Sequence, residues 1–426
     1  MLRRLAVALA LIAGAAPAHG NGRKPATNGV FVQPEHNDTI MVRTTFGLLI
    51  SRDAGCTFRW VCESNIGYGG EYDPKYEIAA DGTIFATTFE GLRVSRDGGC
   101  SFTTATAELP DGDPNKLAGV SVDGLDLAPD GALWISTAEA GRVNDVYVSR
   151  DNGVTFRPAG RSSPTVFWKS LAVAPSRADT VYVAGHELEP PQGHLVRTDN
   201  AGTDWTDVPL TGVAFGVTPL LKVVAVHPTD PDTVFIASID VDGTKGERLY
   251  RSTEGGANLA EVLQTTAPIA NLVFEGDRIL VAAGTGGTHV STDGGATFGP
   301  LAGAPQLACL DKRPDGTLVG CGTNWEPDFK AVATSPDAGA WTKVFRFVEL
   351  AGPLECPAGT MQRDVCDAEQ WPNLRDQFAA TGPQCGAPPP DGPPAEAPGG
   401  CCDTNAAPPF AGLALIGLAL LVRRRR

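Results

Sequence analysis

The chain has 426 residues, with 49 Asp and Glu against 34 Lys and Arg and a net charge of −15. A surface this acidic cannot neutralise a run of phosphates, which excludes nucleic acid as a partner. The ten cysteines show neither paired CxxC nor HxxxH spacing, so we expect no metal site, and no cofactor either.

Residues 1–18 predict a cleaved signal peptide. Two arginines precede an apolar run, which ends at Ala16, Pro17 and Ala18 in the small-x-small pattern that signal peptidase accepts. A buried N-terminal helix is the alternative, but such a helix has no reason to combine a leading charged pair with an alanine-rich cleavage pattern. We therefore expect an exported chain whose cysteines form disulfides in an oxidising compartment.

One short motif recurs through the body of the chain. Seven copies follow one another at intervals of roughly 47 residues, a period typical of solenoids, propellers or arrays. The copies are SRDAGCTF at 51–58, SRDGGCSF at 95–102, SRDNGVTF at 149–156, TDNAGTDW at 198–205, STEGGANL at 252–259, STDGGATF at 291–298 and the shorter SPDAGAW at 335–341.

The sequence around each copy predicts four β-strands. LDLAPDGALWIST, for example, gives two β-type runs around a Pro-Asp-Gly turn, DVYVSRD leads into the third copy, and VTFRPAG follows it. Four antiparallel strands per repeat, without helical periodicity, are typical of a propeller blade. We therefore predict an all-β fold, a seven-bladed β-propeller over residues 29–350, with the motif as the turn between the third and fourth strands.

The residue types of the motif suit a tight turn. The acidic or amide side chain at its third position can accept hydrogen bonds from backbone N–H groups two residues on, and the glycine two residues later takes a positive φ at little cost. An alternative is seven calcium or substrate sites, but one carboxylate beside a turn supplies too few oxygens for a hard cation. The residues at this position are Asp53, Asp97, Asp151, Asn200, Asp293 and Asp337.

This motif resembles the Asp-box, or BNR, repeat of sialidases, sortilin-type receptors, xyloglucanases and photosystem assembly factors. Four copies match well, whereas those that begin at Thr198, Ser252 and Ser335 depart from the pattern. Glu254 and Leu259 are the strongest departures, so we expect the fifth turn to be distorted. A motif shared by so many activities implies the fold and leaves the function open.

Other cysteines and a short helix are expected after the motif repeats. Cys309 and Cys321 are symmetric about the turn at Asp315 and predict a disulfide across a regular hairpin. Cys356 and Cys366 either close a local loop or tie the segment back to the propeller. They belong to an extension at 351–380, in which DAEQWPNLRDQF predicts a short helix that buries Trp371, Leu374 and Phe378.

The C-terminal region predicts a stalk and a membrane anchor. Residues 381–400 are rich in Pro and Gly and read as an extended stalk. Residues 401–426 combine Cys401 and Cys402 with an apolar segment and four arginines, and they resemble the MYXO-CTERM sorting tag of myxobacterial surface proteins. That resemblance implies processing by a protease near the cysteines and delivery to the cell surface. An ordinary single-span anchor is the alternative and gives nearly the same topology.

Candidate ligand-binding residues lie in the loops that vary most in length. TAEAGRVND, GHELEPPQGH, SIDVDGTKGER and GTNWEPDFK all fall on the face opposite the motif turns, where binding loops on a rigid scaffold usually gather. The alternative is that these loops are long because nothing constrains them. The candidates are Tyr68, Tyr72, Tyr76, His186, Glu187, His194, Trp325 and Glu326.

The residues favour binding of an extracellular protein or glycan over catalysis. A sialidase-like or xyloglucanase-like glycoside hydrolase is the alternative. Sialidases of this fold carry an F/Y-R-I-P motif early in the chain, where this chain has FVQPEHND. Hydrolases also need two facing carboxylates, and Glu187 or Asp145 can supply only one each.

Overall fold

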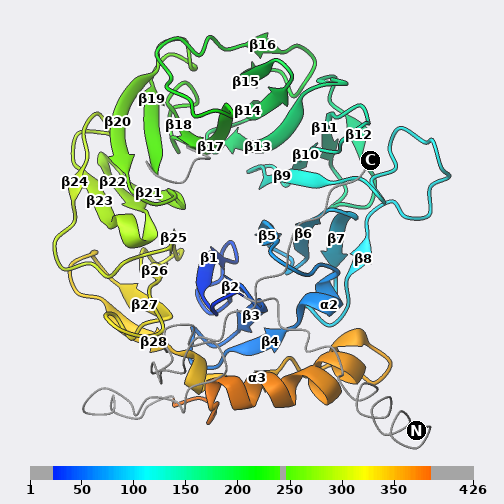
Figure 1. The fold of residues 1–426 in the computed structure, drawn as a ribbon, viewed down its shortest axis with the longest axis vertical. Helices are drawn as coiled ribbons and strands as arrows, with labels where there is room; N and C mark the ends of the chain where they lie inside the picture. The colour runs from blue at the N-terminus through cyan, green and yellow to red at the C-terminus, as the bar shows by residue number, and fades with distance from the viewer. Residues whose placement is uncertain (1–22, 240–245, 385–426) are drawn as a thin grey trace, which may run out of the picture. The chain divides into compact units, whose positions relative to one another are not determined.

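The computed structural model describes residues 23–239 and 246–384. The predicted signal peptide, most of the stalk and the tag at 401–426, with Cys401 and Cys402, lie outside the described residues. Within them the chain forms seven sheets arranged in a ring, six of four strands and one of five (Figure 1). The predicted seven-bladed β-propeller with a short disulfide-linked C-terminal segment is confirmed.

The strands follow the blades in chain order. Blades 1 to 3 comprise β1 (Thr27–Val32), β2 (Ile40–Thr44), β3 (Gly47–Ser51), β4 (Arg59–Val61); β5 (Tyr76–Ile78), β6 (Ile84–Thr88), β7 (Gly91–Ser95), β8 (Thr103–Thr104); and β9 (Val122–Leu127), β10 (Leu133–Thr137), β11 (Val146–Ser149), β12 (Arg157–Pro158). Blades 4 and 5 comprise β13 (Phe167–Ala174), β14 (Arg177–Leu188), β15 (Pro191–Thr198), β16 (Thr206–Asp207); and β17 (Leu220–Val226), β18 (Val234–Ile239), β19 (Glu247–Ser252), β20 (Ala260–Thr265). Blades 6 and 7 comprise β21 (Asn271–Glu275), β22 (Arg278–Ala282), β23 (Thr288–Ser291), β24 (Gly299–Pro300); and β25 (Cys309–Lys312), β26 (Leu318–Cys321), β27 (Val332–Ser335), β28 (Thr342–Phe345). The remaining elements are β29 (Gly352–Pro353) and the short helices α2 (Glu63–Ile66), η1 (Gly284–Gly286), η2 (Phe347–Glu349), η3 (Gln362–Gln370) and α3 (Trp371–Phe378).

Each blade is an antiparallel meander that runs outward from the axis of the ring. Its first strand lies nearest the axis and its fourth at the outer edge (Figure 1). The second strand packs against neighbouring blades on both faces, and all five residues of β6 and of β10 are buried. Such a strand has no solvent-facing side, so polar residues do not alternate along it. The fourth strands β12 and β16 are short and exposed.

The strand order defines two faces of the ring. Because successive strands run in opposite directions, the turns that join first to second and third to fourth strands lie at one end of every blade, here called the turn face. The connections between second and third strands, and those between consecutive blades, lie at the other end, here called the connection face.

The repeated motif forms the turn between the third and fourth strands, and its hydrogen bonds differ in detail from the prediction. In the first copy the Asp53 carboxylate accepts the hydroxyl of Ser51 at 2.8 Å and the amide of Thr57, four residues on, at 2.8 Å. The Ser51 hydroxyl in turn accepts the amide of Gly55 at 2.9 Å. The hydrogen bond from Thr57 to Asp53 spans four residues because Ala54 and Gly55 between them both have positive φ, of 61° and 94°, and fold the chain back.

The expected distortion of the fifth turn was wrong. There the Ser252 hydroxyl accepts the amide of Gly256 at 3.0 Å, and Gly255 and Gly256 both have positive φ, as in the regular copies. The serine hydroxyl and the two glycines are sufficient to hold the backbone, so a glutamate at the third position is tolerated. The seventh turn is the irregular one: it is one residue shorter, and the buried Ser335 hydroxyl has no hydrogen-bond partner.

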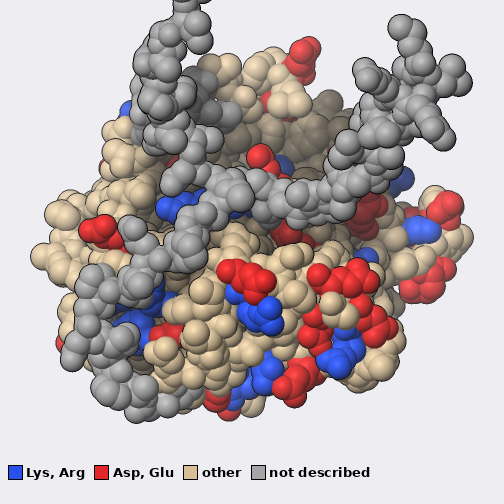
Figure 2. All heavy atoms as spheres, turned by 60° about the horizontal axis from the view of Figure 1, so that its bottom comes forward, with Lys and Arg blue, Asp and Glu red and all other residues tan. Residues whose placement is uncertain are grey.

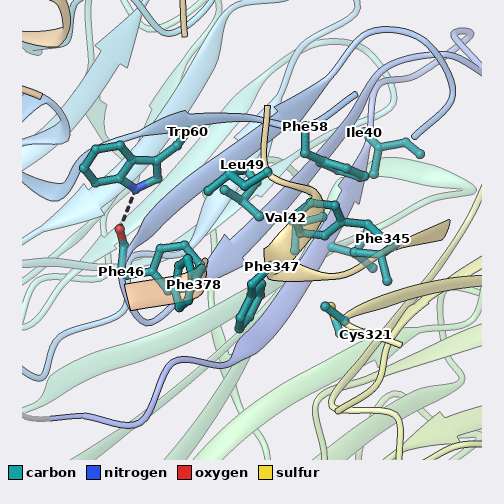
Figure 3. Close-up of a cluster of buried hydrophobic side chains, with 14 of the residues drawn as sticks. Ile40, Val42, Phe46, Leu49, Phe58, Trp60, Cys321, Phe345, Phe347 and Phe378 are labelled. Atoms are coloured by element: carbon teal, nitrogen blue, oxygen red, sulfur yellow. Dashed lines mark hydrogen bonds between the residues drawn. The ribbon is translucent and has the colours of Figure 1, made fainter. Parts of the chain in front are cut away.

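The ring closes between blades 1 and 7, each of which is built from consecutive strands. The amide of Val32 in β1 donates to the Asp311 carboxylate in β25 at 2.9 Å, and the Thr27 hydroxyl donates to the carbonyl of Ala331 at 3.1 Å. A continuous core joins the two blades to the C-terminal segment, with Phe347 packed against Phe46 and other rings (Figure 3).

The C-terminal segment completes this closure from the outer edge of blade 1. Strand β29 adds to β4 in parallel, as a fifth strand, and helices η3 and α3 continue along the same edge (Figure 1). Disulfides Cys62–Cys366 and Cys100–Cys356 tie the segment to the connections that follow β4 and β7, so the tie back to the propeller is the correct alternative. Leu374 and Phe378 are buried, whereas Trp371 is only partly buried.

The remaining described cysteines are also oxidised. Cys309 and Cys321 lie directly opposite each other in the β25–β26 hairpin and are joined, the pairing predicted from their symmetry about Asp315. Cys56 likewise forms a disulfide. Over residues 23–239 and 246–384, no helix is long and apolar enough to span a membrane. The same residues contain no group of three or more His, Cys, Asp or Glu arranged to hold a metal ion.

Replacing Phe347 with alanine should strongly destabilise the protein. Phe347 is 1% exposed and contacts Phe46, Phe345 and Phe378, with ring centroids 5.1, 6.2 and 4.9 Å away. Truncating a buried phenylalanine costs about 3 to 5 kcal/mol, measured here as the free energy of unfolding in urea. The same truncation at the exposed Phe89 is the control and should cost little. A loss below about 1 kcal/mol for F347A would show that this core does not close the ring.

Candidate functional site

The connection face carries most of the exposed apolar side chains. Among the described residues, eight large hydrophobic side chains are exposed, and six of them lie on this face. Val154 lies in a motif turn on the opposite face, and Met361 lies in the C-terminal segment. The six are Phe89, Val143, Leu188, Phe215, Val217 and Trp325. Scattered apolar residues need no explanation, but their concentration on one face does.

Of the four segments predicted as long loops on this face, GHELEPPQGH is part of a β-hairpin. It forms the end of this hairpin, because β14 continues to Leu188 and β15 starts at Pro191. These are the longest adjacent strands of the described chain and extend past the ends of β13 and β16. In SIDVDGTKGER, residues 240–245 lie outside the described part.

Tyr68 and Tyr72 lie in the connection from blade 1 to blade 2, Tyr76 begins β5, and the three differ in exposure. Tyr76 is 1% exposed and packs against Phe31 in the core, so it is not available to a ligand. Tyr72 stacks at 4.4 Å on the exposed Phe89 and bonds through its hydroxyl to Thr87 at 2.7 Å. Tyr68 lies 6.3 Å from Tyr72, ring to ring. Tyr68 and Tyr72 are partly buried, and Phe89 is the exposed member of this aromatic group.

The histidines and Glu187 lie together in blade 4. His186 stacks on Phe167 with 5.6 Å between ring centroids, and His194 stands edge-on to Trp168 at 6.3 Å. The Glu187 carboxylate accepts the hydroxyl of Thr165 and lies 3.6 Å from Nε2 of His194. These side chains hold the base of the β14–β15 hairpin, so they shape the surface above them.

Trp325 and Glu326 lie on the other side of the ring, in the β26–β27 connection of blade 7. Trp325 is 37% exposed, its ring contacts Phe347 at 5.7 Å, and the Lys24 ammonium lies 5.2 Å from the ring centroid. Glu326 is exposed. The predicted residues thus form three separate groups, in blades 1–2, 4 and 7, and do not converge on one point.

Sequence reasoning missed a group of charges on the inner strands. The Lys75 ammonium, just before β5, donates to the carbonyls of Asp123 at 2.6 Å and Lys169 at 2.7 Å. The Asp123 carboxylate lies between Lys75, at 3.3 Å, and the Lys169 ammonium. Burial opposes ionisation of Asp123, but the two ammonium groups outweigh it and lower its pKa. These ion pairs join blades 2, 3 and 4, with both ammonium groups sharing one carboxylate.

A second group consists of three carboxylates on inner strands. Glu77 of β5, Asp126 of β9 and Asp311 of β25 are partly exposed toward the axis. Burial raises the pKa of Asp126 and of Asp311 to about 6, although each accepts two backbone amides. Burial also raises the pKa of Glu77 well above its ordinary value, and the charges of Asp126 and Asp311 raise it further. Among the described residues no group donates a hydrogen bond to the Glu77 carboxylate.

The two carboxylates considered for hydrolysis are both engaged in local structure. Asp145 is 7% exposed and accepts the amides of Val146 at 2.7 Å and Arg161 at 2.9 Å. Burial raises its pKa despite these bonds. Glu187 accepts the hydroxyl of Thr165 and lies 3.6 Å from Nε2 of His194. Thr165 and the Arg161 that contacts Asp145 both belong to the connection between β12 and β13. In the part of the chain that the structure describes, Asp145 and Glu187 do not form a facing pair of free carboxylates.

Comparison with known proteins supports the fold alone. No family model and no curated protein matches the chain. Among solved structures, it is similar to an ancestral GH74 enzyme, with a TM-score of 0.56 at 13% identity over 76% of this chain and 47% of that one. It is also similar to the GH74 enzyme of Niastella koreensis, with a TM-score of 0.44 at 15% identity over 74% of this chain and 65% of that one.

A third similar structure is YCF48 from Cyanidioschyzon merolae, with a TM-score of 0.46 at 12% identity over 70% of this chain and 93% of that one. The chain spans about half to two thirds of the length of the two GH74 structures. The class defined by the fold is therefore the seven-bladed β-propeller. At these identities, similarity of fold assigns no activity.

Replacing Glu77 with glutamine should stabilise the protein at neutral pH and have little effect in acid. A carboxylate whose pKa is raised by folding lowers stability above that pKa, and the penalty vanishes once the pH falls below the unfolded value near 4. The melting temperature of E77Q should exceed that of the parent at about pH 7.5, and the difference should shrink toward about pH 4. The exposed Glu108→Gln variant is the control. A constant difference at all pH values would show that the charge of Glu77 is not the cause.

Proposed function

We propose that this protein is an exported β-propeller, held at the cell envelope by its C-terminal tail, that binds an extracellular protein or glycan through its connection face. The single observation that supports this function is the concentration of exposed apolar side chains on that face. Six of the eight exposed large apolar side chains among the described residues lie on this face, and apolar surface left exposed by a fold commonly marks an interaction site.

The polar groups of the same face argue for binding over catalysis. Asp145, Glu187, Lys75 and Asp123 have their charges or lone pairs engaged by neighbouring protein groups. A general acid or nucleophile must instead present its reactive atom to a substrate. On the face shown in Figure 2, acidic and basic side chains are interspersed.

A glycoside hydrolase is the second candidate, because the ancestral GH74 structure shares the fold with a TM-score above one half. The chain would then require a pair of carboxylates outside those already engaged. Glu326 is exposed in blade 7, and a hydrolase would need a second carboxylate facing it across the sugar ring.

The two functions are separated by a direct assay. We expect the protein to show no turnover of sialyl, β-glucosyl or β-xylosyl chromogenic substrates and to bind at least one member of a glycan and envelope-protein array. Serine replacement of at least one of the six exposed apolar residues of the connection face should weaken that binding, whereas Val154→Ser on the turn face should not. Turnover that disappears in Glu187→Gln or Asp145→Asn would instead establish the hydrolase.

Anchoring by the tail has its own test. Deletion of residues 401–426 should release the protein into the medium, because the apolar segment and the four arginines would no longer retain it at the membrane. Replacing Cys401 and Cys402 with serine should interfere with processing and leave the anchor segment attached. Fractionation and immunoblotting measure both results. Unchanged retention of the deletion variant would contradict a role for the tail.

A further inference from the structure

Part of the connection face, from blade 4 round to blade 7, has few charged residues, although its β18–β19 connection contains Asp240, Asp242 and Lys245. Four of its connections, from blade 4 round to blade 7, carry no Asp, Glu, Lys or Arg: residues 208–219, 266–270, 283–287 and 301–308. Every other inter-blade connection of the ring contains at least one charged residue.

The β18–β19 connection of blade 5, at 240–245, lies outside the described residues.

Three exposed apolar side chains mark the edge of this part of the connection face beside the β14–β15 hairpin. Val217 is 74% exposed, Leu188 is 52% exposed and Phe215 is 36% exposed. We call these three residues the blade 4–5 patch. Leu188 lies at the hairpin tip, and Phe215 and Val217 lie in the connection 208–219 that packs beside it.

The patch is held in place by the backbone on both sides. A Cβ atom at Gly193 would lie 3.1 Å from the Phe215 ring and 3.2 Å from the carbonyl oxygen of Pro219, so a side chain there would push hairpin and connection a few tenths of an ångström apart. The hydroxyl of Tyr250, in β19 of blade 5, accepts the amide of Ala214 at 2.9 Å. Phe215 is thus positioned by blades 4 and 5 while its ring remains exposed.

The chemistry of the patch fits a protein segment better than a sugar. Two of its three side chains are aliphatic, and a sugar ring gains little from them because it stacks on aromatic rings and requires free hydrogen-bonding groups around it. At the base of the hairpin the Glu187 carboxylate accepts the Thr165 hydroxyl, and Nδ1 of the buried His186 is left without a hydrogen-bond partner among the described residues. Apolar side chains of a protein partner would be buried here at about 25 cal/mol per Å² of surface removed from water.

The charged residues around the patch indicate whether its partner is acidic or basic. Glu189, at the hairpin tip beside Leu188, is exposed and has no ion-pair partner among the described residues. Arg161 pairs with Asp207 at 2.5 Å and Lys222 pairs with Glu247 at 2.7 Å, whereas Lys169 in blade 4 shares Asp123 with Lys75. The chain as a whole carries −15. Both the local and the long-range field therefore attract a basic partner.

We propose that the blade 4–5 patch is a docking surface for a protein segment that presents apolar side chains flanked by Lys or Arg. This inference rests on the proposed binding function and specifies its location and the class of its partner.

The test uses the full-length protein and synthetic peptides of one length whose content of leucine and phenylalanine and whose net charge vary independently. We expect apolar, basic peptides to bind best. The double variant F215S/V217S should lose at least about tenfold in affinity for them, because the apolar contact is the centre of the interface. Val154→Ser, similarly exposed at 54% on the turn face, is the matched control and should bind as the parent does. Thermal melts confirm that each variant is folded.

Charge reversal at Glu189 tests the second half of the proposal. Glu189→Lys should reduce the preference for basic over acidic peptides severalfold at low salt, with a smaller effect at high salt. Glu254→Lys, in a motif turn on the opposite face, is the control.

Several results would overturn the proposal. These are equal binding of basic and acidic apolar peptides, no peptide binding at all, or unchanged affinity in F215S/V217S. Co-sedimentation of the protein with phosphatidylethanolamine and phosphatidylglycerol vesicles, lost in the same double variant, would assign the patch to a membrane instead. If binding of an array ligand is lost in F89S and kept in F215S/V217S, the proposed function stands and the patch does not. If only V154S lowers binding, both fail.

Discussion

Closure of the ring between blades 1 and 7 is the constraint on which the rest of the structure depends. A propeller buries the faces of its sheets only when the last blade packs against the first. Here both blades are built from consecutive strands, so no strand from one end of the chain completes the sheet at the other. The shared core around Phe347, the added strand β29 and the disulfides to Cys62 and Cys100 perform that role. The short C-terminal segment is therefore part of the propeller.

The two faces of the ring are stabilised in different ways, and this difference explains where function can reside. On the turn face, the serine and aspartate of each regular motif satisfy the backbone of the turn, so the sequence is nearly repeated there. Although burial opposes it, the bonds from Thr155 and Ser149 lower the pKa of Asp151 to about 2 and keep its carboxylate ionised as an acceptor. The connection face has no such repeated requirement, and its connections are free to differ from blade to blade.

The charges near the axis show why polar residues inside a fold are poor guides to function. Lys75, Asp123 and Lys169 look like a binding cluster, yet each is satisfied by its neighbours and the group links three blades. Glu77 is different, because it is partly buried without a hydrogen-bond donor among the described residues, and burial raises its pKa well above the ordinary value. Exposed apolar side chains such as Val217 and Leu188 gain nothing from the fold itself, which makes them the better evidence for a partner.

The sequence alone determined the all-β class, the number of blades and the place of the motif between the third and fourth strands, because those depend on local turn chemistry repeated seven times. It also determined the Cys309–Cys321 pairing, which needs only the symmetry of one hairpin. Only the tertiary structure decided the partners of Cys356 and Cys366, the burial of Tyr76 and the separation of Trp325 from His186. Those depend on which segments, distant in sequence, the closed ring brings together. The uncharged connection 208–219 was readable in the sequence, but its position beside the β14–β15 hairpin follows from the packing of blade 5 on blade 4.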